Sequence, residues 1–170
     1  MRNHDEERLL AAKNEFDILK RIKHNHVVKV KKFYPTEREI YTVMEFVEGQ
    51  ELFDRISEID KYDESVARHL FVQLLETIDF LHSKGICHRD IKPSNILVLK
   101  DEEKIKLADF NVSKFCEDSH FQMLTHTGTE AFKAPEMFKY AFYNEKVDLW
   151  SAGCVLYTML GGYQPFYDDW

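Results

Sequence analysis

Four polar residues between positions 90 and 109 could together perform chemistry on a phosphate group. The Asp90 carboxylate can accept a proton from a hydroxyl and orient that hydroxyl, and Lys92 supplies a compact cation close by. Asn95 and Asp109 offer the hard oxygen ligands that Mg²⁺ prefers. Phosphoryl transfer needs charge neutralisation and an aligned nucleophile more than covalent chemistry by the protein, so these residue types fit that reaction. Taken alone, each carboxylate would be interpreted as a solvated loop acid.

Two short apolar runs must position these residues. Residues 96–99 and 105–108 flank the charged turn at 101–103 and predict a β-hairpin. Asp90 lies in the loop that enters the first strand, and Asp109 directly follows the second. The two carboxylates are expected to lie in one shared cleft of the folded chain.

The N-terminal third predicts a helix followed by a hairpin. Apolar residues recur at helical spacing over residues 6–23, and two strand-like runs follow at 27–34 and 39–47 with a turn at Pro35. Gly49 is expected to end the second strand.

The remaining chain predicts mainly helices. A short helix is expected at 51–59, and a longer one begins at Asp63, which is a favourable N-cap, and ends at Gly85. Residues 111–132 show no sustained period and predict a long functional loop. A helix follows Glu136, and residues 146–160 are apolar nearly all round, which predicts a helix buried in the core. The fold class is therefore α+β.

Composition limits the type of protein. The chain has 170 residues, a net charge of −7 and 44% hydrophobic residues, which is typical of a water-soluble globule and argues against a nucleic-acid or membrane partner. The longest apolar run is too short to span a bilayer, and the N-terminus lacks the apolar stretch of a secretory signal. The 3 cysteines are widely spaced and odd in number, which fits free thiols in a reducing compartment. An intracellular, cytoplasmic location is expected, with the nucleus left open; no oligomeric state follows from the residues.

An ordered set of short motifs resembles the eukaryotic protein kinase catalytic core, closest to Ser/Thr kinases of the calmodulin-dependent type. The motifs occupy residues 15–19, 43–47, 88–97, 109–111, 134–136 and 148–153. The resemblance implies a two-lobed fold, with residues 1–47 as a partial N-lobe and residues 48–170 as a partial C-lobe. It also implies ATP and Mg²⁺ as cofactors and proteins with Ser/Thr acceptors as substrates, the latter because of Lys92.

The resemblance assigns roles to individual residues. Asp90, Lys92 and Asn95 are the expected catalytic residues, and Thr129 would help to fix Asp90 and Lys92. Asn95 and Asp109 would bind the metal. The expected nucleotide-binding residues are Glu15, Met44, Glu45, Val47, Glu51, Asn95, Leu97 and Asp109.

Within that set, the resemblance implies that Glu15 is the ion-pairing glutamate of the family's C-helix and that Met44 packs in the pocket wall. Leu97 would lie beneath the base.

Further expectations concern the residues that hold the Asp90 loop in place and the regulation of the protein by phosphorylation. His88 is expected to be a structural histidine in a stack with Leu19, Val30 and Phe110, and Asp148 is expected to cap the catalytic loop from below. Thr125 occupies a position where many relatives are phosphorylated by an upstream kinase, and a phosphate there could pair with Arg89. The alternative that Thr125 is simply a polar loop residue remains open.

The sequence departs from the family in three ways. It begins at the expected C-helix and contains no glycine before Gly49, so the family's glycine-rich loop and the strand lysine that would pair with Glu15 are missing. It also ends soon after the 146–160 helix. Asn111 replaces the last glycine of the metal motif, and asparagine is among the residues that best tolerate positive φ.

These departures predict the activity of the isolated chain and the exposure of apolar side chains on the 146–160 helix. The isolated chain is expected to be inactive, and Trp150, Tyr157 and Met159 are expected to be partly uncovered. The alternative function is a pseudokinase or truncated scaffold that binds protein partners. A small-molecule kinase is disfavoured by the Ala134-Pro135-Glu136 element.

Overall fold

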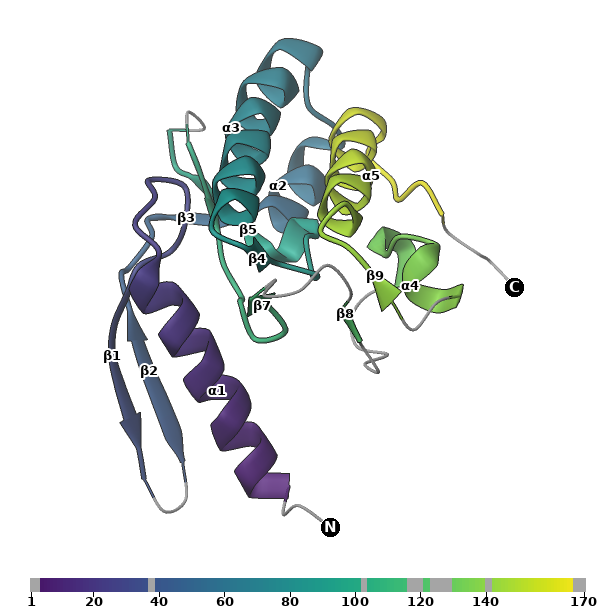
Figure 1. Ribbon diagram of the computed structural model, residues 1–170. Coiled ribbons are helices and arrows are strands. Elements are labelled where there is room, and N and C mark those ends of the chain that lie inside the picture. Colours follow the sequence, from purple (N-terminus) through teal and green to yellow (C-terminus); the bar gives the residue numbers. More distant parts are fainter. Residues whose placement is uncertain are drawn as a thin grey trace.

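The computed structural model describes residues 4–36, 39–101, 104–115, 121–122, 130–139 and 142–166. It is a mixed α and β structure in which α1 (His4–Arg21) lies along the hairpin of β1 (Val30–Pro35) and β2 (Ile40–Met44), away from the helices of the main core (Figure 1). The other long helices are α2 (Leu52–Ile59), α3 (Glu64–Ser83) and α5 (Val147–Gly161). The expected α+β class is confirmed, whereas the division into lobes at residue 47 stays a prediction.

Helix α1 packs on the hairpin through its apolar face. Phe16 and Phe33 contact with ring centroids 5.3 Å apart, and Ile18 and Leu19 are buried. Strand β1 begins at Val30 rather than at the predicted residue 27. The reason is a tertiary hydrogen bond. The N–H of Val28 donates to the Leu107 carbonyl at 3.0 Å, so this part of the chain bonds to a different sheet.

The second sheet has the order β3-β5-β6 and is antiparallel, with β3 at Gly49–Glu51, β5 at Ile96–Leu99 and β6 at Ile105–Leu107. The predicted β5–β6 hairpin is confirmed. The prediction for Gly49 is wrong, because the second strand, β2, already ends at Met44 and Gly49 begins β3. A Cβ at this position would lie 2.1 Å from the Val98 carbonyl oxygen, so only glycine lets the two strands approach.

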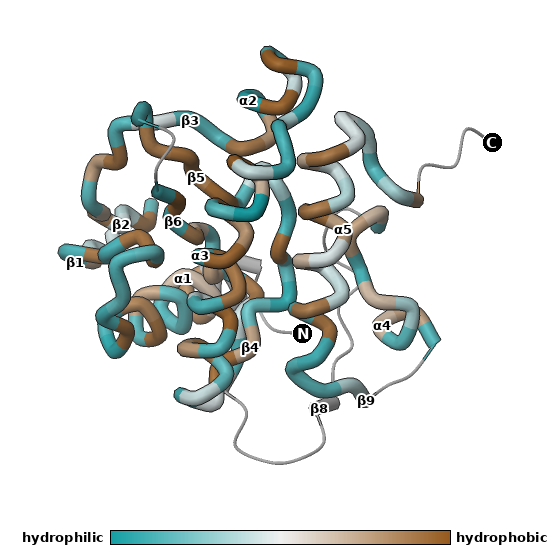
Figure 2. Tube along the Cα trace, turned by 90° about the horizontal axis from the view of Figure 1, so that it is seen from above, coloured by the Kyte–Doolittle hydropathy of each residue, from teal (hydrophilic) through white to brown (hydrophobic). Residues whose placement is uncertain are grey.

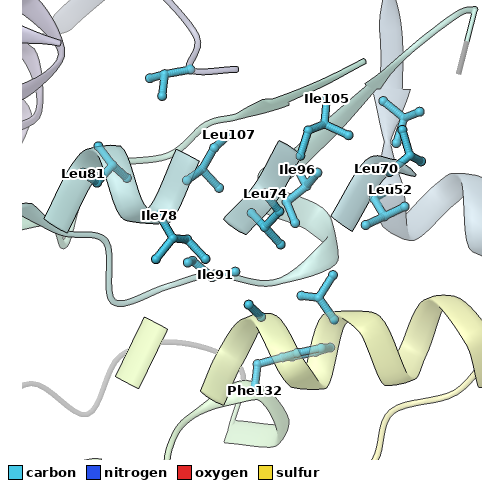
Figure 3. Packing of buried hydrophobic residues seen from close by; sticks show 14 of the residues in the cluster. Leu52, Leu70, Leu74, Ile78, Leu81, Ile91, Ile96, Ile105, Leu107 and Phe132 are labelled. Carbon is cyan, nitrogen blue, oxygen red and sulfur yellow. The ribbon is translucent and has the colours of Figure 1, made fainter. Parts of the chain in front are cut away.

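The main core lies between this sheet, α3 and α5. Seen from above, α3 lies between the strands and α5 (Figure 2). Figure 3 shows apolar side chains filling the space between these elements, among them Leu70, Leu74, Ile78, Leu81, Ile96, Ile105, Leu107 and Phe132. Each such side chain contributes roughly 1.5–3 kcal/mol through burial, and this packing fixes the segments that lead into β5 and out of β6.

Helix α5 is buried on one face only, which corrects the prediction of a helix buried all round. Val155 and Met159 face the core, so the expected exposure of Met159 is wrong. Trp150 and Tyr157 are 39% and 44% exposed, as expected. The helix ends at Gly162, whose φ of 81° is the left-handed conformation that glycine adopts readily and whose N–H donates to the Thr158 carbonyl.

The predicted loop at 111–132 contains regular structure in its described parts. β7 (Lys114–Phe115) pairs with β4 (Ile86–Cys87), and β8 (Phe121–Gln122) pairs with β9 (Phe142–Tyr143). Two-residue strands are too short to show a period, which is why the sequence did not predict them. A 3₁₀ turn at Glu130–Phe132 and the short helix α4 (Glu136–Lys139) follow, the latter as expected. Thr125 and Thr129 lie outside the described residues.

None of the helices in the described ranges combines the length and apolar character needed to cross a membrane.

Candidate active site

The loop after β4 holds Asp90 in a small network of its own residues. Its Oδ2 accepts from Lys92 Nζ at 2.8 Å and from Asn95 Nδ2 at 2.9 Å, and its backbone carbonyl accepts a second bond from the same Asn95 nitrogen at 2.8 Å. Among the described residues, no group donates to Oδ1. Within the described part of the chain, the carboxylate is therefore oriented through Oδ2 alone.

Local geometry explains why these three residues meet. Pro93 begins a 3₁₀ turn at Pro93–Asn95, and the Asn95 N–H donates to the Lys92 carbonyl at 3.0 Å. This turn brings the Asn95 side chain back towards Asp90. Arg89 has a φ of 71°, which is unfavourable for a residue with a Cβ and must be stabilised by its surroundings.

Asp148 supplies that stabilisation from α5. Its Oδ1 accepts the Arg89 N–H at 2.7 Å, and its Oδ2 accepts the His88 N–H at 2.9 Å and His82 Nε2 at 2.9 Å. Burial alone would raise the pKa of Asp148, but these hydrogen bonds and the nearby His88 lower it below its usual value. The expected cap beneath the catalytic loop is confirmed, and His82 is a partner that the sequence did not indicate.

Asp109 follows β6 with a φ of 59°, so the backbone turns sharply at the expected metal ligand. Its Oδ1 accepts the Asn111 N–H at 3.3 Å and the Asn111 side-chain amide at 2.7 Å. Among the described residues, Asp109 has a positive φ and Asn111 does not. The left-handed backbone conformation that a glycine at position 111 would favour therefore occurs at Asp109. The Asn111 side chain donates a hydrogen bond to the Asp109 carboxylate.

Glu15 reaches the same segment from α1. The buried carboxylate accepts the Phe110 N–H at 3.3 Å. Desolvation by burial raises the pKa of Glu15, and the nearby Asp109 charge raises it further, while the Phe110 bond acts in the opposite direction. A buried carboxylate in this state costs folding free energy at neutral pH and would gain from a cationic partner.

His88 connects the Asp90 loop to the Asp109 segment. Its Nδ1 accepts the Asp90 N–H at 3.3 Å, and its Nε2 lies 3.1 Å from the Ala108 carbonyl, which it contacts as a donor in the neutral ring. Burial is the main cause of its lowered pKa. The ring contacts Phe110 edge-on at 4.6 Å, in the core that also contains Leu19 and against which Val30 packs. This agrees with the structural role expected for His88.

The expected base-binding residues gather along the β3-β5-β6 sheet. Glu51 pairs with Leu97, and Leu97 pairs with Lys106, so the three residues form one row across the strands. Directly paired residues of neighbouring strands place their side chains on the same face of a sheet. Met44, the last residue of β2, and Val47, in the segment that joins β2 to β3, are both half-buried.

Lys106 was missed by the sequence analysis. Its Nζ lies 2.7 Å from Glu45 Oε1 and 3.0 Å from the Asn25 carbonyl oxygen. The alternation of Ile105, Lys106 and Leu107 marks the lysine as facing away from the core. No feature of the sequence identifies its partners, which are distant along the chain.

The donor set fits Mg²⁺ bound through few protein ligands. Asn95 Nδ2 is used for Asp90, so its side-chain oxygen remains available, and in the described part of the chain nothing donates to Asp109 Oδ2. Mg²⁺ commonly keeps several waters and binds one or two side-chain oxygens together with substrate phosphates. The described residues contain no group of three or more His, Cys, Asp or Glu side chains that could hold a metal.

Comparison with known proteins identifies the family. The protein kinase domain model matches residues 1–170. The chain belongs to the protein kinase family. It is 42% identical over 161 residues to the calcium/calmodulin-dependent protein kinase type 1 of Caenorhabditis elegans, which covers 94% of the chain and 46% of that protein.

Other relatives are similar over the same region. The type 1 enzyme of Macrobrachium nipponense is 42% identical over 161 residues, or 94% of the chain and 46% of its own length. The type IV enzyme of Mus musculus is 41% identical over 160 residues, or 93% of the chain and 34% of its own length. The chain thus spans less than half the length of these kinase-family relatives.

Proposed function

We propose that the protein containing this chain transfers the terminal phosphoryl group of ATP to Ser or Thr hydroxyls of protein substrates. The observation that carries the proposal is the Asp90 network. One carboxylate oxygen is fixed by Lys92 and Asn95, while the other is free of donors among the described residues. A general base needs this combination of a fixed orientation and an available lone pair.

Each remaining group has a defined task in this proposal. Asp90 Oδ1 accepts the hydrogen bond of the substrate hydroxyl and directs its oxygen along the line of attack. Lys92, held beside Asp90, offers its cation to the transferred phosphoryl group. Asn95 and Asp109 would hold Mg²⁺, which when bound neutralises charge on the phosphates.

The sheet residues would bind the nucleotide. Leu97 provides an apolar floor for the base, the Glu45 and Val47 backbone offers hydrogen-bonding groups to its edge, and Glu51 reaches the ribose. Glu15 has a raised pKa because of burial, so a cation beside it would be stabilising. The relatives' names support this proposal, since they are calcium/calmodulin-dependent protein kinases.

Two further assignments depend on residues that the structure does not describe. Thr129 is proposed to hold Asp90 and Lys92 in place from the following segment. Thr125 is proposed as the target of an upstream kinase, and a phosphate there is proposed to pair with Arg89.

The test is phosphate transfer by the full-length gene product. With Mg·ATP and a Ser/Thr peptide, Asp90→Asn is expected to lower kcat by at least about 100-fold because the general base is lost. Asp79→Asn on the exposed face of α3 is the matched control and should keep wild-type activity. Equal transfer by wild type and Asp90→Asn would refute the assignment, and transfer by neither, with peptide still bound, would indicate a scaffold.

A further inference from the structure

The row Glu51–Leu97–Lys106 continues beyond the residues assigned to the nucleotide. Two of its members, Glu51 and Leu97, are expected to contact ribose and base, and the third is a lysine with no assigned role. Lys106 pairs directly with Leu97 across β5 and β6. A cation beside the floor of a base site needs a structural reason, because it is otherwise costly to bring next to an apolar surface.

The reason is a set of hydrogen bonds on Glu45. Its Oε1 accepts both Lys106 Nζ at 2.7 Å and the Lys29 N–H at 2.9 Å, and the Glu45 N–H donates to the Lys29 carbonyl at 2.8 Å. Lys106 Nζ also donates to the Asn25 carbonyl at 3.0 Å. One lysine thus joins β6, the chain between α1 and β1, and the segment that follows β2.

The pair is shielded from water more than an ordinary surface ion pair. The Lys106 and Glu45 side chains are 15% and 21% exposed, whereas the neighbouring Lys100–Glu48 pair, at 3.8 Å, is 82% and 75% exposed. Partial burial strengthens the attraction and reduces its screening by salt. The Lys100 pair, near the same segment, provides a natural comparison with a weak interaction.

We propose that Lys106 is a positioning residue for nucleotide binding, which fixes the backbone of residues 45–47 relative to Leu97. Through Glu45, it sets the distance between the groups that would bind the edge of the base and the floor on which the base would lie. The inference deepens the proposed function and depends on it for the identity of the ligand. The clamp itself (Lys106, Glu45 and the carbonyl of Asn25) can be measured without any nucleotide.

The first measurement is amide hydrogen exchange of the full-length protein without nucleotide. Lys106→Met keeps the length of the side chain and removes its charge, and it is expected to increase exchange at residues 45–47. Lys106→Arg should restore most of the protection, and Lys100→Met should leave it unchanged. If Lys106→Met folds and exchange at 45–47 does not rise, the clamp is refuted.

The second measurement is the Kd of a fluorescent ATP analogue. Lys106→Met should raise Kd at least about fivefold, the lower end of typical coupling energies, and raise KM for ATP more than it lowers kcat. Glu45→Gln tests the same pair from its other side if Lys106→Met fails to fold. The double variant should lose little more than either single variant, because both remove one interaction.

The outcomes separate the two proposals. Increased exchange with a raised Kd supports both. Increased exchange in Lys106→Met, together with a wild-type protein that binds no nucleotide, would refute the proposed function and leave the clamp intact. Unchanged exchange and unchanged Kd in Lys106→Met and Glu45→Gln would overturn the inference while leaving phosphoryl transfer untouched.

Discussion

The backbone N–H of His88 donates to the Asp148 carboxylate at 2.9 Å, although the two residues lie 60 positions apart in the chain. The same carboxylate receives the Arg89 N–H, so a helix in the core determines the backbone of the loop that carries Asp90. The positive φ of Arg89 is stable only while these bonds exist. The geometry of the candidate active site therefore depends on the packing of α5.

Replacing this carboxylate should destabilise the whole chain. Asp148→Asn removes the charge and one acceptor from a site where three donors converge, so the free energy of unfolding is expected to fall by about 3 kcal/mol or more. Urea denaturation monitored by circular dichroism measures this decrease in the free energy of unfolding. Asp79→Asn is the exposed control and should change stability by less than about 0.5 kcal/mol. A similar small change for Asp148→Asn would show that the loop holds itself in place.

The buried His88 should make stability depend on pH in mild acid. Burial lowers its pKa in the folded state below the unfolded value of 6.5, so the unfolded chain binds more protons as pH falls below that value. Stability is then lost between pH 6.5 and the folded pKa, with a slope of about 1.4 kcal/mol per pH unit for one proton.

The test compares slopes rather than absolute stabilities. His88→Gln should reduce the dependence of unfolding free energy on pH between 5 and 6.5, whereas the exposed His69→Gln on α3 should not. An unchanged slope in His88→Gln would mean that other groups cause the acid sensitivity. The contribution of Asp148 is separate, because its lowered pKa affects stability only below about 3.8.

Asn111 is expected to weaken metal binding by Asp109, the proposed Mg²⁺ ligand that it contacts. Its side-chain amide shares Asp109 Oδ1, which reduces the negative charge available to a cation. Asn111→Gly keeps the backbone donor and removes this competitor, so the Mg²⁺ concentration for half-maximal activity should fall about two- to tenfold, the equivalent of one hydrogen bond. Stability should decrease by about 0.4–1 kcal/mol because glycine is more flexible when unfolded. A higher Mg²⁺ requirement would instead show that the amide helps to orient the ligand.

Periodic segments were predictable and long-range pairings were not. The helix at Glu64–Ser83 and the hairpin of β5 and β6 follow directly from repeating apolar residues, and both are confirmed. The boundaries failed where tertiary bonds decided them, as at Val28, whose N–H bonds to Leu107 instead of continuing β1. Local patterns cannot contain that information, because the partner lies in another element.

The same distinction between local motifs and long-range partners applies to the residues of the candidate site. The short motifs identified Asp90, Lys92, Asn95 and Asp109 together, and the structure places Lys92 and Asn95 on Asp90. His82 and Lys106 were missed because their partners are Asp148 and Glu45, which are remote in sequence. Their roles become visible only when the helices and strands are packed.

The tight approach at Gly49 limits how this protein can vary. Even a methyl group there would collide with the carbonyl of Val98 and push β3 away from β5. Glu51 would move with that strand, since its place beside Leu97 depends on the same pairing. Given the proposed contact of Glu51 with the ribose, a substitution at position 51 would alter sugar selectivity, whereas position 49 accepts only glycine. The smallest residue of β3 thus determines the position of an acidic side chain two residues further along the chain.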